Sequence, residues 1–288
     1  MQQKTGLVLE GGAMRGMYTA GILDVLMEHH VVLDGAIGVS AGAAFGCNYK
    51  SRQIGRSIRY NLKYCKNKHY CSVYSLIRTG DLYGGEFCYH KLPTELDLFD
   101  VPTYTANPMP FYVVATDVES GKPVYHRADR ADDTDMEWFR ASASMPLVSN
   151  IVQIGDKHLL DGGMSDPIPL AYFQSLGYSR NVVILTQPRG YRKTENKSLP
   201  LLRVMLRKYP NAVKVMANRH LVYNRTTQFV LDSEQAGDTF VFAPKESLPI
   251  KRICRDPELL QQTYDIGRKQ ALELLPDLLR FLGKEEKA

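Results

Sequence analysis

The chain alternates short apolar runs with stretches of helical periodicity, and this pattern limits its possible folds more than any other feature. The runs cover residues 6–9, 35–37, 111–115 and 182–185. Each is too short for a buried helix and fits a strand that is covered on both faces. Strands that alternate with helices favour an α/β fold, with a mostly parallel sheet and helices on both of its faces.

The pattern changes after residue 188. Residues from Leu199 to about Asp232 and from Pro257 to Leu282 have the periodicity of long helices, and residues 238–242 are typical of one more strand. We therefore expect an α/β core over residues 1–188 and a mainly helical C-terminal extension over residues 189–288 that packs on the core. The length of 288 residues is compatible with one large domain that carries such an appendage.

Composition excludes several protein classes. The 36 Lys and Arg against 31 Asp and Glu give a net charge of +5, and 44% of the residues are hydrophobic, which excludes disordered and fibrous chains. No apolar run approaches the roughly 18 residues of a membrane span. Glu10, Arg15 and Asp24 interrupt the first apolar residues, so no signal peptide is expected. Five cysteines, an odd and sparse set, indicate a reducing compartment, the cytoplasm.

A G-x-S-x-G motif, Gly38-Val39-Ser40-Ala41-Gly42, ends the second expected strand and begins a helix. A serine on such a tight turn takes a strained backbone conformation, and Gly38 and Gly42 relieve the crowding on either side of it. The hydroxyl is then exposed at a helix N-terminus, where partial positive charge stabilises an anion. This context is typical of a nucleophilic serine, so we predict that role for Ser40.

A glycine-rich loop, Gly11-Gly12-Ala13-Met14-Arg15-Gly16, follows the first expected strand. Consecutive glycines let backbone N–H groups converge on a negative centre. A nucleotide-binding regulator is the alternative, but a dinucleotide turn needs glycine where Ala13 stands, and a P-loop needs a Gly-Lys-Ser/Thr end. We therefore interpret the loop as an oxyanion hole that faces Ser40, with Arg15 fixing the loop or stabilising charge.

The serine also needs a base. A Ser-His-Asp triad is one option, but 39 residues cannot hold the strands and crossovers that precede the nucleophile in an ordinary α/β-hydrolase. His126, His158 and His220 lie in no compelling motif. Asp161-Gly162-Gly163 follows two strand-like segments, 151–154 and 158–160, and its glycines would let Asp161 turn towards the serine. An Asp-Gly pair alone is a common turn, but in combination with the loop and the serine motif we favour Asp161.

Four motifs in this order resemble the patatin-like phospholipase family: the glycine-rich loop, the G-x-S-x-G, Ala141-Ser142-Ala143-Ser144-Met145-Pro146, and Asp161-Gly162-Gly163. The match runs from Gly11 to Gly163 and extends to about Gln187. The whole chain is similar to bacterial members that carry a helical extension. The resemblance implies a three-layer α/β/α sandwich with a mostly parallel central sheet.

The resemblance also implies acyl-ester hydrolysis by a Ser-Asp dyad on lipid esters, without metal or cofactor. Ser40 would be the nucleophile, and Asp161 the general base that later passes the proton to the leaving alcohol. Gly11, Gly12 and Ala13 would supply oxyanion N–H groups. Ala13 departs from the family's third glycine, and alanine adopts positive φ only at a cost, so the hole would be shifted slightly. The alternative is a catalytically weak lipid- or membrane-binding protein that keeps the fold.

Residues 50–68 contain seven basic side chains and no acidic one. Arg52, Arg56, Arg59, Lys63 and Lys66 would form one stripe on a helix, opposite Ile54, Ile58, Leu62 and Cys65. Two interpretations stay open: a solvated face, or a contact with anionic lipid headgroups at the inner membrane surface, near the mouth of the site. Nucleic acid is a weaker candidate because no known docking motif accompanies the stripe.

A second basic segment spans residues 188–225, with ten basic residues against Glu195. It fits either another contact with an anionic surface or a helical face that is paired with acids elsewhere. Cysteine and histidine residues around the first segment fit no common zinc pattern, so we predict no metal site there; they are Cys65, His69, Cys71, Cys88 and His90.

Overall fold

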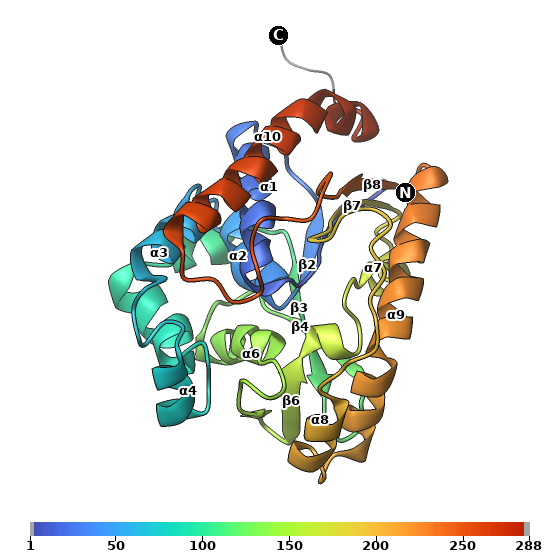
Figure 1. The fold of residues 1–288 in the computed structure, drawn as a ribbon. Helices are drawn as coiled ribbons and strands as arrows, with labels where there is room; N and C mark the ends of the chain where they lie inside the picture. Colours follow the sequence, from blue (N-terminus) through green and yellow to red (C-terminus); the bar gives the residue numbers. More distant parts are fainter. Residues whose placement is uncertain (1–2, 285–288) are drawn as a thin grey trace.

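A computed structural model describes residues 3–284, and within this range the chain forms one eight-stranded sheet in the order β5-β6-β3-β2-β1-β7-β8, with β4 paired to β3 (Figure 1). The strands are β1 (Thr5–Leu9), β2 (Gly35–Val39), β3 (Phe111–Asp117), β4 (Pro123–Arg127), β5 (Val152–Ile154), β6 (Lys157–Asp161), β7 (Arg180–Ile184) and β8 (Thr239–Phe242). Strands β3, β2, β1, β7 and β8 are parallel, whereas β4, β5 and β6 form antiparallel pairs. The predicted mostly parallel α/β fold is confirmed.

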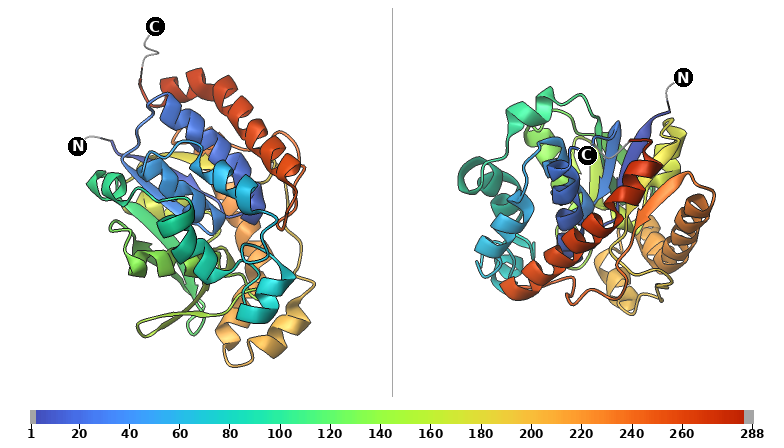
Figure 2. Two further views of the ribbon diagram at one scale, coloured as in Figure 1. Left: turned by 90° about the vertical axis from the view of Figure 1, so that its left-hand side faces the viewer. Right: turned by 90° about the horizontal axis from the view of Figure 1, so that it is seen from above.

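Helices cover both faces of this sheet, which makes the three layers that the family resemblance implies (Figure 2). Helices α1, α2, α6 and α10 lie on one face, and α7 and α9 on the other. The helices are α1 (Gly16–Glu28), α2 (Ala41–Lys50), α3 (Arg56–Tyr64), α4 (Val73–Thr79), α5 (Val101–Ala106), α6 (Asp133–Ala143), α7 (Leu170–Ser175), α8 (Leu199–Met205), α9 (Pro210–Gln235) and α10 (Pro257–Phe281). Short turns η1 (Ala13–Arg15) and η3 (Gly162–Met164) and a π-helical segment η2 (Phe87–Leu96) complete the list.

The strand sequences are apolar throughout because both faces of the sheet are buried. Leu7 and Leu9 of β1 pack with α1 and α10 on one face, and Val8 between them packs with α7 and α9 on the other. All three side chains have no exposed surface. This two-sided burial is what the short apolar runs predicted.

The region expected to be one helix from Leu199 to Asp232 is two helices, so that prediction was wrong in one respect. Helix α8 ends at Met205 and α9 begins at Pro210. Proline has no N–H and favours the first position of a helix, and it disfavours helical backbone in the residue before it. Tyr209 accordingly has φ −125° and ψ 70°.

The C-terminal part is built into the sheet and the helical layer. Strand β8 pairs in parallel with β7, for example Phe240 with Val182, so the sheet continues past residue 188. Helix α10 lies along α1 (Figure 1). Two glycines allow this contact: a Cβ on Gly21 would lie 2.2 Å from the Tyr264 carbonyl oxygen, and one on Gly267 would lie 2.1 Å from the Tyr18 oxygen. None of the helices in residues 3–284 is both long and apolar enough to cross a bilayer.

Replacing Gly267 with alanine is expected to destabilise the fold, although alanine alone favours a helix by about 1 kcal/mol. The added methyl group would press α10 away from α1, and such overpacking costs about 1–3 kcal/mol. Urea unfolding of G267A should therefore show a loss of stability. The control is Lys269→Ala on the exposed side of α10, which should change stability little. An unfolding midpoint of G267A at or above that of the wild type would contradict this account of the contact.

Candidate active site

Ser40 and Asp161 meet because two strands share one edge of β3. Residues 112–116 of β3 pair with β4 on one edge, so β2, paired with 111–114, and β6, paired with 115–117, must both lie on the other. Strand β2 runs parallel to β3 and β6 runs antiparallel, so their carboxyl ends face each other. Val39 is opposite Val114, and Asp161 is opposite the next residue, Ala115. The residue after β2, Ser40, is thereby placed beside the last residue of β6.

Ser40 stands in a strained backbone conformation, with φ 54° and ψ −124°, between β2 and α2. Such values are rare for a residue with a side chain and persist only where the surroundings enforce them. Close packing at the two flanking glycines enforces them here. A Cβ on Gly42 would lie 2.5 Å from the Leu9 carbonyl oxygen, and one on Gly38 would lie 2.6 Å from the Ala43 nitrogen.

The end of α6 and the residue after it hold the backbones of Ser40 and Asp161 in place. The Ser40 N–H donates to Ser142 Oγ (2.8 Å), and this hydroxyl donates in turn to the Val114 carbonyl (2.6 Å). Two residues later, the Ser144 carbonyl accepts from the Asp161 N–H (2.8 Å). The Ala-Ser-Ala-Ser segment therefore holds the backbones of both candidate residues in place.

Asp161 is buried, and its carboxylate accepts from the Gly163 N–H at 2.7 Å, with the Ser40 side chain close enough to lower its pKa. Burial raises the pKa of Asp161, because a charged carboxylate loses solvation in the protein. The positive charge of Arg219 opposes this rise in pKa most strongly, followed by the Ser40 side chain and the Gly163 N–H. A carboxylate with a raised pKa is a better proton acceptor than an exposed one.

Arg219 comes from α9, in the C-terminal part of the chain. Its Nε donates to the Gly163 carbonyl at 2.6 Å, so the guanidinium lies beside the turn that follows Asp161. Sequence reasoning noted Arg219 only as one charge among ten in residues 188–225. No motif marks it, and the contact joins residues 56 positions apart.

The glycine-rich loop passes directly over Ser40. A Cβ on Gly11 would lie 2.9 Å from the Ser40 Cβ. Among residues 3–284, the N–H groups of Gly11, Gly12 and Ala13 donate to no acceptor within hydrogen-bond distance. Ala13 has φ 49°, in the left-handed region. This backbone conformation is unfavourable by about 1 kcal/mol for alanine, whereas glycine adopts it without strain. Arg15 is partly buried beside the loop, and its Nε has no hydrogen-bond partner in the described part of the chain.

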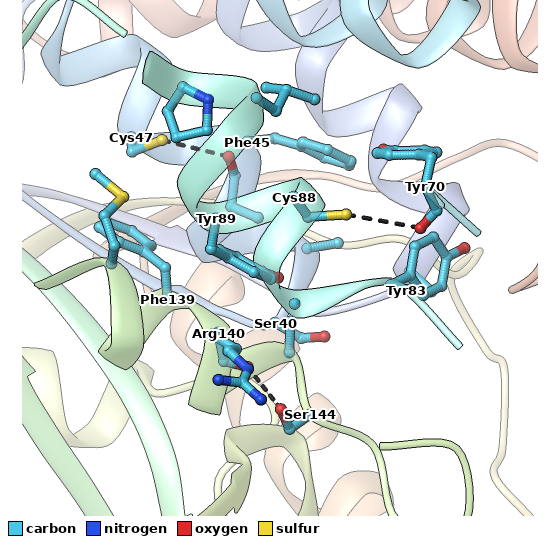
Figure 3. Close-up of a pocket in the computed structure, with 18 of the residues that line it drawn as sticks. Ser40, Phe45, Cys47, Tyr70, Tyr83, Cys88, Tyr89, Phe139, Arg140 and Ser144 are labelled. Carbon is cyan, nitrogen blue, oxygen red and sulfur yellow. Dashed lines mark hydrogen bonds between the residues drawn. The ribbon is translucent and has the colours of Figure 1, made fainter. Parts of the chain in front are cut away.

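An apolar cavity opens on one side of Ser40. Figure 3 shows the serine at one end of it, with aromatic rings gathered above. Its apolar lining includes Phe45, Tyr60, Tyr70, Tyr83, Tyr89 and Phe139. These rings come from α2, α3, η2, α6 and the loops around α4. The cavity has the shape and chemistry of a site for an extended apolar group.

A second, polar hollow also borders Ser40. It is lined by Glu10, Asp161 and four basic side chains, which are Arg15, Lys193, Arg219 and Arg252. Three of the described residues, Ala13, Ser40 and Met145, line both the apolar cavity and this hollow. Ser40 therefore stands between an apolar and a cationic compartment.

None of the three histidines considered for a triad contacts Ser40 in the described residues. His126 pairs with Asp135 (2.7 Å) and stacks on Trp138, and His158 pairs with Glu119 (3.0 Å). His220 borders a neighbouring polar cavity that Asp161 also lines. Within residues 3–284, no group of three or more His, Cys, Asp or Glu side chains is placed to hold a metal ion.

The expected basic stripe does not form as one exposed face. Helix α3 spans Arg56–Tyr64, so Arg52 precedes it and Lys66 follows it. Arg56 is only 4% exposed, and its guanidinium donates to the Asp97 carbonyl at 3.1 and 2.6 Å. Arg59 is bound to both Asp97 carboxylate oxygens at 2.8 Å. Ile54, expected on the apolar side, is 46% exposed.

Three of the expected basic residues, Arg52, Lys63 and Lys66, lie exposed at the surface, as does Lys68. The stripe was overestimated because Asp97, far away in the sequence, supplies a buried partner for Arg56. A run of charges in sequence does not reveal such a partner.

Comparison with known proteins agrees with this geometry. A family model described as "Patatin-like phospholipase" matches residues 7–173, more than half of the chain, and one described as "Domain of unknown function (DUF6363)" matches residues 209–283. The uncharacterized protein YjjU of Escherichia coli strain K12 is 31% identical over 202 residues, 64% of this chain and 52% of that protein. An uncharacterized NTE family protein of Mycobacterium bovis, Mb1092c, is 25% identical over 169 residues, 58% and 45% of the two chains.

The chain thus spans about half the length of the curated relatives it matches. Among solved structures, VipD from Legionella pneumophila aligns over 96% of this chain and 67% of its own, at 13% identity and a TM-score of 0.48. The residues that match this family include the glycine-rich loop, Ser40 after β2 and Asp161 at the end of β6. The chain belongs to the patatin-like phospholipase family.

Proposed function

We propose that this protein is a serine acyl-ester hydrolase that acts on lipid esters, with Ser40 as nucleophile and Asp161 as general base. Membership of the patatin-like phospholipase family supports lipid acyl hydrolysis in general. The observation that carries the specific proposal is the position of Ser40. It lies under a loop whose N–H groups have no partner among residues 3–284, beside a buried carboxylate, and at the end of an apolar cavity.

In the proposed mechanism, Asp161 accepts the proton of the Ser40 hydroxyl as the oxygen attacks the ester carbonyl. The negative oxygen of the tetrahedral intermediate then lies near the N–H groups of Gly11, Gly12 and Ala13, and each such donor is worth roughly 3–4 kcal/mol in related sites. Asp161 returns the proton to the leaving alcohol, and water then releases the acyl group from Ser40 by the same steps.

The aromatic cavity supports a long acyl chain as the group that is transferred. Each methylene moved from water into such a cavity contributes about 0.8 kcal/mol, so the cavity would favour long chains over short ones. The backbone strain at Ser40 and the loop contacts place the hydroxyl before substrate binds, which lowers the cost of ordering it in the transition state.

Substitution of either proposed catalytic residue tests the assignment. Ser40→Ala and Asp161→Asn should each reduce hydrolysis of a medium-chain ester by at least about a thousandfold, because one removes the nucleophile and the other its base. Circular dichroism should show that both variants remain folded. The control is Ser149→Ala, a serine that lines the same cavity and should retain activity within a few-fold. Retained activity in S40A or D161N refutes the dyad; if the wild type binds lipid without hydrolysis, the lipid-binding alternative is favoured.

The charge of Arg219 leads to a second prediction, which concerns the pH dependence of activity. Its positive charge lowers the pKa of Asp161, so Arg219→Met should raise that pKa. Asp161 must be deprotonated to accept a proton, and a higher pKa delays deprotonation to higher pH. The acid limb of kcat/KM against pH should therefore move to higher pH in R219M. Arg225→Met, an exposed arginine on the same helix, is the control. An acid limb of R219M that coincides with the wild type would show that the charge has no such role.

We also propose that the α4 side of the protein contacts lipid surfaces. Helix α4 carries Val73, Tyr74 and Ile77, which are 66%, 43% and 78% exposed, and the Nζ of the exposed Lys68 lies 4.8 Å from the centre of the Tyr74 ring. Tyr70 before this helix and Asp81 after it both line the apolar cavity. Apolar side chains next to basic ones are typical of a surface that rests on anionic membranes.

Vesicle sedimentation tests this contact. The protein should pellet more with vesicles that contain phosphatidylglycerol than with pure phosphatidylcholine vesicles, and Ile77→Glu should weaken that binding about tenfold or more by removing apolar contact and adding negative charge. The matched control is Leu272→Glu, which replaces an exposed leucine on α10 and should bind as the wild type does. Equal pelleting with both vesicle types, or unchanged binding by I77E, would argue against the surface.

A further inference from the structure

Four basic side chains converge on the polar hollow beside Ser40 from four separate parts of the chain. Arg15 lies at the end of η1, Lys193 in the loop after β7, Arg219 on α9, and Arg252 in the loop before α10. Lys193, Arg219 and Arg252 also line the adjoining polar cavity that extends from Asp161. Three of the four come from the C-terminal part of the chain, outside the residues that match the patatin-like model.

The two carboxylates of the hollow are outnumbered by these four basic side chains. Glu10 is buried, and its two oxygens accept from the Thr186 N–H (2.5 Å) and the Tyr223 hydroxyl (2.7 Å). Asp161 accepts from the Gly163 N–H at 2.7 Å. Within residues 3–284, none of the four basic side chains forms a salt bridge, although arginines elsewhere, such as Arg189 and Arg268, do.

The fold holds Lys193 in this cationic setting. Its N–H donates to Asn224 Oδ1 at 2.7 Å, its carbonyl accepts from Asn224 Nδ2 at 3.0 Å, and its Nζ lies 3.7 Å from the centre of the Tyr223 ring. Burial, followed by the nearby Arg219, lowers the pKa of Lys193 to about 6, so this amine is largely neutral at pH 7 and an anion bound beside it would favour its protonated form. Arg15, Lys193 and Arg219 are half-buried and Arg252 is exposed, and within residues 3–284 the buried Arg15 Nε has no hydrogen-bond partner, so a bound anion would relieve the repulsion among these groups.

The shape of the site indicates where that anion belongs. Ser40 lies at the junction of the apolar cavity and the hollow, so an ester at Ser40 with its acyl chain in the cavity would direct its alcohol part into the hollow. Several guanidinium groups around one point suit the tetrahedral oxygens of a phosphate, which they bind by paired hydrogen bonds.

We propose that Arg15, Lys193, Arg219 and Arg252 bind a phosphate group carried by the alcohol part of the substrate. This inference rests on the proposed hydrolase function and narrows its substrate class to acyl esters that bear a phosphate close to the ester. The C-terminal part of the chain then determines headgroup preference, and the family core supplies the chemistry.

A matched pair of substrates tests the proposal: a 1-acylglycerol and the corresponding 1-acylglycerol 3-phosphate with the same acyl chain, both below their critical micelle concentrations. The wild type should have the higher kcat/KM for the phosphorylated ester. Arg252→Gln should lower the ratio of the two kcat/KM values by about ten- to a hundredfold, because a charged hydrogen bond to the phosphate is lost. Lys251→Gln, a neighbouring exposed residue that lines neither cavity, should keep the wild-type ratio. An unchanged ratio in R252Q overturns the proposal.

Binding of inorganic phosphate supplies a readout that needs no hydrolysis. Calorimetric titration of phosphate into the S40A variant of this 288-residue chain, at constant ionic strength, should show saturable binding that Lys193→Met and Arg252→Gln each weaken. Absence of binding overturns the anion site. Binding of phosphate together with an unaffected substrate ratio would assign the site to free phosphate and overturn the headgroup role. If the wild type hydrolyses neither ester, the proposed function fails, and the titration alone decides whether the anion site exists.

Discussion

The arrangement of this site depends on one feature of the sheet, the shared edge of β3. Because β4 occupies the other edge, β2 and β6 must follow each other along the same one, with their carboxyl ends facing. That junction places the residue after Val39 beside Asp161 and leaves space for the strained turn at Ser40. The Ser142 and Ser144 contacts then fix each residue to the end of α6. A shift of either strand by one residue would separate the hydroxyl from the carboxylate.

The strands and the two motif-bearing turns were predictable because their causes are local. Short apolar runs report burial on both faces, and the expected strands at residues 6–9, 35–37, 111–115, 182–185 and 238–242 are confirmed. The turn at Ser40 could be predicted because the chain passes so close to Leu9 at position 42 that only glycine fits there, and this requirement appears in the sequence as the G-x-S-x-G motif. The roles of Ser40 and Asp161 stay predictions, although the structure brings the two residues together.

What sequence reasoning missed depends on partners that are distant in the chain. Arg56 was placed on an exposed stripe because nothing near it in sequence suggests burial, and its partner Asp97 lies 41 residues away. Arg219 had no role because its partner, the Gly163 carbonyl, lies on another element. The break between α8 and α9 had a local signal, the Tyr209-Pro210 pair, that the helical periodicity obscured. The C-terminal part thus supports the core through β8 and α10 and also contributes charge to the site.

The central claim is that Ser40 is activated by Asp161, and covalent labelling tests it most directly. A fluorophosphonate reacts with an activated serine by forming an O–P bond with loss of fluoride, and peptide mass spectrometry then locates the adduct. The account predicts one adduct on the peptide that contains Ser40 in the wild type, and labelling slowed by at least about a hundredfold in the folded D161N protein. An unmodified Ser40 in the folded wild type, or equal labelling rates with and without the Asp161 carboxylate, would contradict it.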